Sequence, residues 1–144
     1  MGMYTGLRFK GVVKEEFREK FEDIAMEGSW EDSDDEKFLE FSNDYRASFI
    51  PCGMLCYMPW DEDDREFART YNLETGHWVF QCSMKNYNET IEEFLDMVPY
   101  FIESVEFCEV FYEEWGWSAG YELVDGKMKE TQPRFICYAE HSEC

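Results

Sequence analysis

Residues 7–26, LRFKGVVKEEFREKFEDIAM, decide the fold of this chain. In the first seven of these residues, Leu7 and Phe9 alternate with Arg8 and Lys10, which is the two-residue period of a strand with one buried face. In the last twelve, apolar side chains recur at spacings of four, three and one, which places them on one face of a helix. A strand that leads into an amphipathic helix predicts helices packed on a sheet.

The chain after this unit predicts more strands than helices. Gly28 ends the first helix, residues 29–36 form an acidic loop, and a short helix follows around residues 38–41. Apolar and alternating segments predict further strands at 48–57, 66–71, 77–84, 105–112 and 134–138.

A second long helix and a hairpin are predicted in the second half. The helix begins near Asn86 or Asn88, which are both good capping residues, and Pro99 is predicted to kink or split it. Its apolar face consists of Ile91, Phe94, Leu95, Val98 and Ile102. The dipeptide Asp125–Gly126 predicts a two-residue turn in a hairpin over residues 121–130.

This order of elements predicts an α+β fold with two layers: a mainly antiparallel sheet and two main helices. A ferredoxin-like core with extra strands fits the order. The chain has 144 residues and no Gly-, Ser- or Pro-rich linker, so we expect a single domain over residues 1–144. Aromatic residues make up 19% of it, which predicts a core built largely from rings.

Neither end of the sequence nor its interior suggests a membrane protein. The first residues lack the basic region and long apolar stretch of a secretory signal, and no apolar run approaches the ~18 residues that span a bilayer. We therefore expect a cytoplasmic protein.

The six cysteines are predicted to be structural free thiols, because four of them stand beside large apolar residues and a cytoplasmic compartment keeps thiols reduced. Those four are Cys56, Cys82, Cys108 and Cys137. Zinc is the alternative, but the pair Cys52 and Cys56 has no second close pair to complete a site. Residues 32–36 and 61–64 lack the EF-hand pattern. We expect no metal and no cofactor.

Catalytic motifs are absent from the sequence. It contains no P-loop, G-x-G-x-x-G, G-x-S-x-G or H-E-x-x-H pattern, and it has two histidines, His77 and His141. The many carboxylates do not by themselves indicate an acid/base pair. We expect no catalytic residues and no enzymatic activity, and an enzyme using a carboxylate or a thiol is kept as an alternative.

Charge is the most unusual property of the chain. It has 33 acidic and 13 basic residues, a net charge of -20 and an isoelectric point near 4.3. Such a chain repels nucleic acids and anionic membranes, so the expected partner is a basic protein. From Asn86 to Gly126 there are eleven acidic residues and no Lys or Arg. A generically acidic surface, as in proteins of salt-adapted organisms, is the alternative interpretation.

Three acidic clusters are the candidate partner-binding residues. They are Glu31, Asp32, Asp34, Asp35 and Glu36 in the first cluster, Asp61, Glu62, Asp63 and Asp64 in the second, and Glu89, Glu92, Glu93 and Asp96 in the third. The third cluster places like charges four residues apart on one helix stripe, which costs a few tenths of a kcal/mol per pair. We expect this stripe to face solvent and to serve binding. Trp30 and Trp60 stand beside acidic clusters and are expected to be exposed aromatic anchors.

These properties lead to a first hypothesis, a nucleic-acid mimic that blocks a basic nucleic-acid-processing enzyme such as a nuclease. The opening residues MYTGLRFKG, 3–11, resemble those of small acidic proteins carried by phages and mobile elements of Gram-positive bacteria. In overall character the chain resembles phage inhibitors of bacterial defence, including anti-restriction and anti-CRISPR proteins. That resemblance implies an inhibitor acting in the host cytoplasm, and it brings no functional residues with it.

A small-ligand binding protein is the second hypothesis. Trp78, Trp115 and Trp117 are rings that would stack on a nucleotide base or a similar signal molecule. An anionic ligand would further require basic residues to gather in one pocket, and the residues considered for it are Arg8, Lys10, Arg46 and Arg134.

Overall fold

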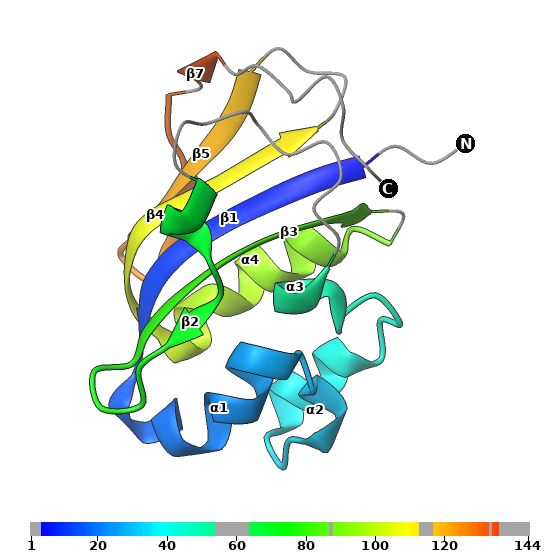
Figure 1. Ribbon diagram of the computed structural model, residues 1–144, viewed down its shortest axis with the longest axis vertical. Helices are drawn as coiled ribbons and strands as arrows, with labels where there is room; N and C mark the ends of the chain where they lie inside the picture. Colours follow the sequence, from blue (N-terminus) through cyan, green and yellow to red (C-terminus); the bar gives the residue numbers. More distant parts are fainter. Residues whose placement is uncertain (1–3, 54–63, 87, 113–116, 133, 136–144) are drawn as a thin grey trace.

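The computed structural model describes residues 4–53, 64–86, 88–112, 117–132 and 134–135 (Figure 1). Its strands are β1 (Tyr4–Val13), β2 (Thr70–Tyr71), β3 (His77–Lys85), β4 (Ile102–Tyr112), β5 (Trp117–Val124), β6 (Lys127–Glu130) and β7 (Arg134–Phe135). Its helices are α1 (Arg18–Glu27), α2 (Glu36–Ser42), α3 (Phe49–Cys52) and α4 (Thr90–Phe101). Three short 3₁₀ segments are η1 (Glu15–Phe17), η2 (Trp30–Asp32) and η3 (Asp64–Phe67).

The strands form one antiparallel sheet in the order β2-β3-β1-β4-β5-β6, with β7 paired to β5. The helical crossovers run from β1 to β2 and from β3 to β4. A β-α-β-β-α-β chain with the order β4-β1-β3-β2 is the ferredoxin-like arrangement. The predicted α+β fold is therefore confirmed, and β5, β6 and β7 are the extra strands.

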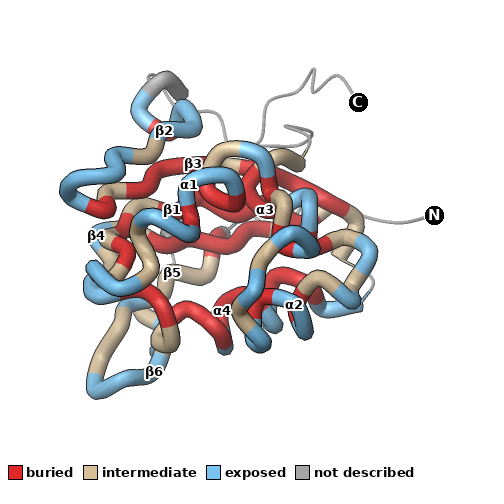
Figure 2. The backbone as a smooth tube through the Cα atoms, turned by 90° about the horizontal axis from the view of Figure 1, so that it is seen from below, coloured by how far each residue is buried: buried red, intermediate tan, exposed pale blue. Residues whose placement is uncertain are grey.

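The core lies between the sheet and the helices, and aromatic rings dominate it. Phe9 of the central strand contacts Phe94 of α4, and Trp78 of β3 contacts Phe21 of α1, with ring centroids 5.8 and 4.9 Å apart. Both helices therefore cover the same face of the sheet, as Figure 1 shows. Figure 2 shows the buried residues concentrated in the central strands and the inner faces of the helices.

Several predicted elements are found where the sequence places them. Gly28 ends α1 in the left-handed conformation (φ 68°), as its lack of a side chain permits. The turn at Asp125–Gly126 joins β5 and β6, with positive φ at both residues, as a type I′ hairpin requires. Cys82 and Cys108 are buried free thiols, and burial raises their pKa values far above the ordinary range. Cys56 and Cys137 lie outside the described residues.

Two predicted strands are wrong over most of their described residues. In the segment 48–57, residues 49–52 form the short helical segment α3, in which the buried Ile50 keeps an extended conformation (φ −110°, ψ 111°). Pro51 has no N–H to donate to a sheet ladder, and residues 54–57 lie outside the described residues. Of residues 66–71, only Thr70 and Tyr71 form a strand. Phe67 lies in η3 and packs on Phe107 on the far face of the sheet, with ring centroids 5.2 Å apart.

Helix α4 differs from its prediction at both ends. It begins at Thr90 rather than at Asn86 or Asn88, and Glu89 precedes it in the left-handed conformation. Pro99 does not split the helix: it lies inside α4, which continues to Phe101, and the Ile102 N–H still bonds the Val98 carbonyl. Lys14 closes this end: its ammonium donates to the carbonyls of Pro99 and Tyr100 at 3.1 and 3.2 Å. A cation at a helix C-terminus is favourable.

Candidate functional site

The described residues form a groove of about 700 Å³ between α2 and the first turns of α4. It is lined by Lys37, Glu40, Phe41, Asn43, Asp44, Asn88, Glu93, Asp96 and Met97, a set called here the α2–α4 groove. The two helices lie side by side in Figure 2. Phe41 and Met97 are buried side chains that form an apolar floor, and the carboxylates stand around it.

Asp35 and Tyr100 fix α2 at one end of the groove. The Asp35 carboxylate accepts bonds from the backbone N–H groups of Lys37 and Phe38 at 2.9 and 3.2 Å, which is an N-cap. Its other oxygen accepts from the Tyr100 hydroxyl at 2.7 Å. That bond raises the pKa of Tyr100 above its ordinary value. The Lys37 ammonium lies 4.5 Å from the centre of the Tyr100 ring, so it occupies this same end.

Asp44 fixes the opposite end. One of its carboxylate oxygens accepts from the buried Thr90 hydroxyl at 2.6 Å, which ties the segment after α2 to the start of α4. The other accepts from the backbone N–H of Arg46 at 3.0 Å. Because both oxygens hold a partner, Asp44 and the two residues after it are held in one arrangement relative to α4.

The groove carries a concentrated negative charge. Glu40, Asp44, Glu93 and Asp96 contribute four negative charges and Lys37 one positive charge, so the lining has a net charge of about −3 when all are ionised. Partial desolvation raises the pKa of Glu93, and the neighbouring carboxylates of Asp44, Glu89 and Asp96 raise it further. The site therefore favours a cation that would relieve this repulsion.

Of the third predicted cluster, Glu93 and Asp96 line the groove, and Glu89 is close enough to act on Glu93. Glu92 does not join them. Its carboxylate accepts from the Asn86 side chain at 2.6 Å, so it is engaged next to the groove rather than in it. All four side chains are exposed, as predicted, but only Glu93 and Asp96 line the groove.

The first predicted cluster is divided as well. Glu31 and Asp32 are exposed in η2, Asp34 is exposed and lies 3.7 Å from Lys20, and Glu36 is exposed in the first turn of α2. Asp35 is engaged as the N-cap described above. In the second cluster, Asp61, Glu62 and Asp63 lie outside the described residues. Asp64 begins η3, and its side chain also lies outside them.

The prediction that Trp30 is an exposed anchor is wrong. Trp30 is fully buried, and its indole N–H donates to the Ile50 carbonyl at 2.7 Å, because the 3₁₀ turn of η2 directs the ring into the core. Trp60 lies outside the described residues. The exposed ring beside the groove is Tyr45, which sequence reasoning missed together with Glu40 and Asp44. The four-residue spacing of Glu36 and Glu40 is a signal that could have found the acidic face of α2, and Asp44 follows in the turn after that helix.

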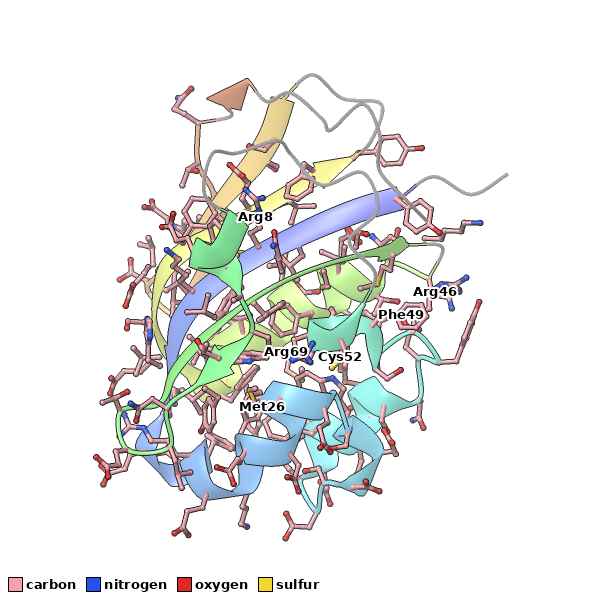
Figure 3. The ribbon with its side chains drawn as sticks, viewed as in Figure 1. Arg8, Met26, Arg46, Phe49, Cys52 and Arg69 are labelled. Atoms are coloured by element: carbon pink, nitrogen blue, oxygen red, sulfur yellow. The ribbon has the colours of Figure 1, made fainter. Side chains whose placement is uncertain are left out.

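The residues considered for a small anionic ligand do not form a pocket among the residues that the structure describes. Trp78 is buried, and its indole N–H donates to the Ala25 carbonyl at 2.9 Å. Arg8 is fully buried on the far face of the sheet, where it donates to Gln81 at 3.0 Å, and Lys10 pairs with Glu66. Figure 3 shows Arg8 and Arg46 in separate parts of the molecule.

Three further residues of that hypothesis lie outside the described part of the structure. They are Trp115 and the side chains of Trp117 and Arg134. Within the described ranges, no three His, Cys, Asp or Glu side chains are placed to hold a metal ion. In the same part of the chain, no helix is long and apolar enough to cross a membrane.

Comparison with known proteins identifies no relative: no family model matches the chain, and no curated protein or solved structure matches it significantly.

Proposed function

We propose that the protein is an acidic protein-binding inhibitor, a nucleic-acid mimic that blocks a basic nucleic-acid-processing enzyme of a bacterial defence system. One observation carries the proposal: α2 and α4 present their carboxylates together, on a surface whose local basic residues, Lys37 and Arg46, are outnumbered. We call Glu36, Glu40, Asp44, Glu89, Glu93 and Asp96 the α2–α4 acidic surface.

The α2–α4 acidic surface carries a local excess of negative charge, which is the property that a nucleic-acid mimic needs. Glu36, Glu40 and Asp44 come from α2 and the turn after it, and Glu89, Glu93 and Asp96 come from the start of α4. Its six carboxylates stand against the Lys37 ammonium and the Arg46 guanidinium, so the surface has a net charge of about −4 when all are ionised. Duplex DNA likewise carries closely spaced negative charges, one per ~1.7 Å of axis. A basic channel that binds nucleic acid would therefore attract this surface, with rapid and salt-sensitive association.

A capture experiment tests the proposal. Tagged protein is incubated with bacterial lysate at low and at high salt, and captured proteins are identified and assayed for nucleic-acid processing. We expect a basic nucleic-acid enzyme to be captured at low salt only, to be inhibited by the protein, and to be released by duplex DNA. The variant Glu93→Lys/Asp96→Lys should capture much less of it.

The matched control is Glu22→Lys/Asp23→Lys, which makes the same charge change at exposed positions of α1. Equal loss of capture by both variants would mean that net charge alone attracts the enzyme. An enzyme that is captured but keeps full activity on nucleic acid would contradict the mimic.

A further inference from the structure

The α2–α4 groove has a shape and a floor that charge mimicry alone does not require. A surface that only imitates phosphates needs carboxylates in water, whereas here Phe41 and Met97 line a concavity of about 700 Å³ beneath them. Lysine and arginine side chains combine an aliphatic stem with a cationic head, and they bury the stem on apolar surface while the head stays polar. The groove offers a matching surface for each part: apolar side chains for the stem and carboxylates for the cationic head.

Tyr45 adds a flat anchor next to the groove. It directly follows Asn43 and Asp44 of the lining, and it is 71% exposed, more than any other large apolar or aromatic side chain in the described part of the chain. The guanidinium of Arg46 lies 4.5 Å from the ring centre and donates to the Tyr45 hydroxyl. Figure 3 shows Arg46 beside Phe49, which is 38% exposed, at this edge of the molecule.

This edge is held in place before any partner arrives. The Asp44 carboxylate bonds both the Thr90 hydroxyl and the Arg46 backbone, as described above, and stacking under Arg46 restricts the Tyr45 ring. Tyrosine and arginine are enriched among residues that dominate binding energy, and a preordered ring loses little entropy on binding. Lys37 lies over Tyr100 at the opposite end of the groove, so it does not take the Asp44 end.

We propose that the α2–α4 groove accepts one lysine or arginine side chain of a basic protein partner, with its stem on Phe41 and Met97 and its head among the four carboxylates. Tyr45 then packs on the residues that flank this side chain. Charge complementarity selects the occupant, since a lining of net charge about −3 disfavours an acidic or neutral segment. The inference rests on the proposed function in one respect, that the partner is a basic protein.

Synthetic peptides test the inference without the natural partner. One capped peptide carries lysines, and a second carries 2,4-diaminobutyrate at the same positions, which keeps the charge and shortens the stem. Affinity is measured by calorimetry at fixed ionic strength, and the methyl resonance of Met97 is followed by NMR after assignment with Met97→Leu. We expect the lysine peptide to bind more tightly, by roughly two- to fourfold per methylene in contact, and to shift Met97.

Matched variants locate the site. Glu93→Gln/Asp96→Asn should weaken the lysine peptide at least about tenfold, since it removes charge-assisted bonds to the head. Glu22→Gln/Asp23→Asn removes the same charges from α1 and should change affinity far less. Tyr45→Ala should weaken binding while thermal unfolding shows an intact fold, because the side chain is mostly exposed.

The inference would be overturned if the two peptides bound equally tightly, if both double variants lost the same affinity, and if the Met97 resonance did not shift. Binding would then depend on long-range charge attraction alone. That result differs from a failure of the proposed function. If the groove binds lysine peptides but no nucleic-acid enzyme is captured, the function fails and the inference stands. If the enzyme is captured equally by wild type and Glu93→Gln/Asp96→Asn, the groove inference alone fails.

Discussion

At the scale of single residues, Glu93 shows that the acidic groove costs stability. Desolvation and three neighbouring carboxylates raise its pKa, so the folded protein binds this proton more tightly than the unfolded chain does. The ionised form is therefore disfavoured by folding. The contribution of Glu93 to stability is greatest when it is protonated, and it falls as the pH rises through the raised pKa.

We therefore expect Glu93→Gln to stabilise the protein at pH 7 by a few tenths of a kcal/mol, or about 1–2 °C in Tm. The gain should shrink towards zero near about pH 4, where the wild-type carboxyl is itself largely protonated. Thermal unfolding at the two pH values measures this difference. A gain that is equal at both pH values would mean that the amide acts through packing rather than through charge.

At the scale of elements, α2 depends on a single side chain at each end. Asp35 caps its first turn and holds Tyr100, and Asp44 ties the segment after it to α4. The helix is seven residues long, too short to be stable by itself in water. These contacts and the buried faces of Phe38 and Phe41 position the acidic side of α2 beside α4.

Asp35→Ala is accordingly expected to lower the free energy of unfolding by about 1–2 kcal/mol, since the helix cap is lost. Urea denaturation checks this value. The neighbouring variant Asp34→Ala should change stability by less than about 0.5 kcal/mol, because Asp34 is exposed and lies 3.7 Å from the exposed Lys20. If the two variants were equally stable, α2 would not depend on its cap.

At the scale of the whole molecule, the net charge of -20 repels itself in the compact state. We expect the Tm to rise by several degrees when salt is increased from about 20 mM to about 0.5 M, because the Debye length shortens from roughly 20 Å to a few ångströms. Sodium chloride and choline chloride should act alike if screening is the cause. An increase with sodium alone would instead indicate specific cation binding.

The sequence alone was sufficient for the elements that local physics dictates. The strand β1, the apolar face of α4, the helix end at Gly28 and the turn at Asp125–Gly126 each follow from neighbouring residues. It was misleading where tertiary contacts override local pattern. The β-like segment around Ile50 is a short helix, and Phe67 leaves its predicted strand to pack on the far face of the sheet.

For the site, the sequence determined the sign and amount of charge, because composition and spacing do not depend on the fold. Which carboxylates act together was decided by tertiary structure. Packing of α2 on α4 joins Glu40 and Asp44 to Glu93 and Asp96, assigns Asp35 to a helix cap, and turns Glu92 towards Asn86. Burial of Trp30 and exposure of Tyr45 likewise depend on which ring the core can enclose, and that is set by residues far apart in the chain.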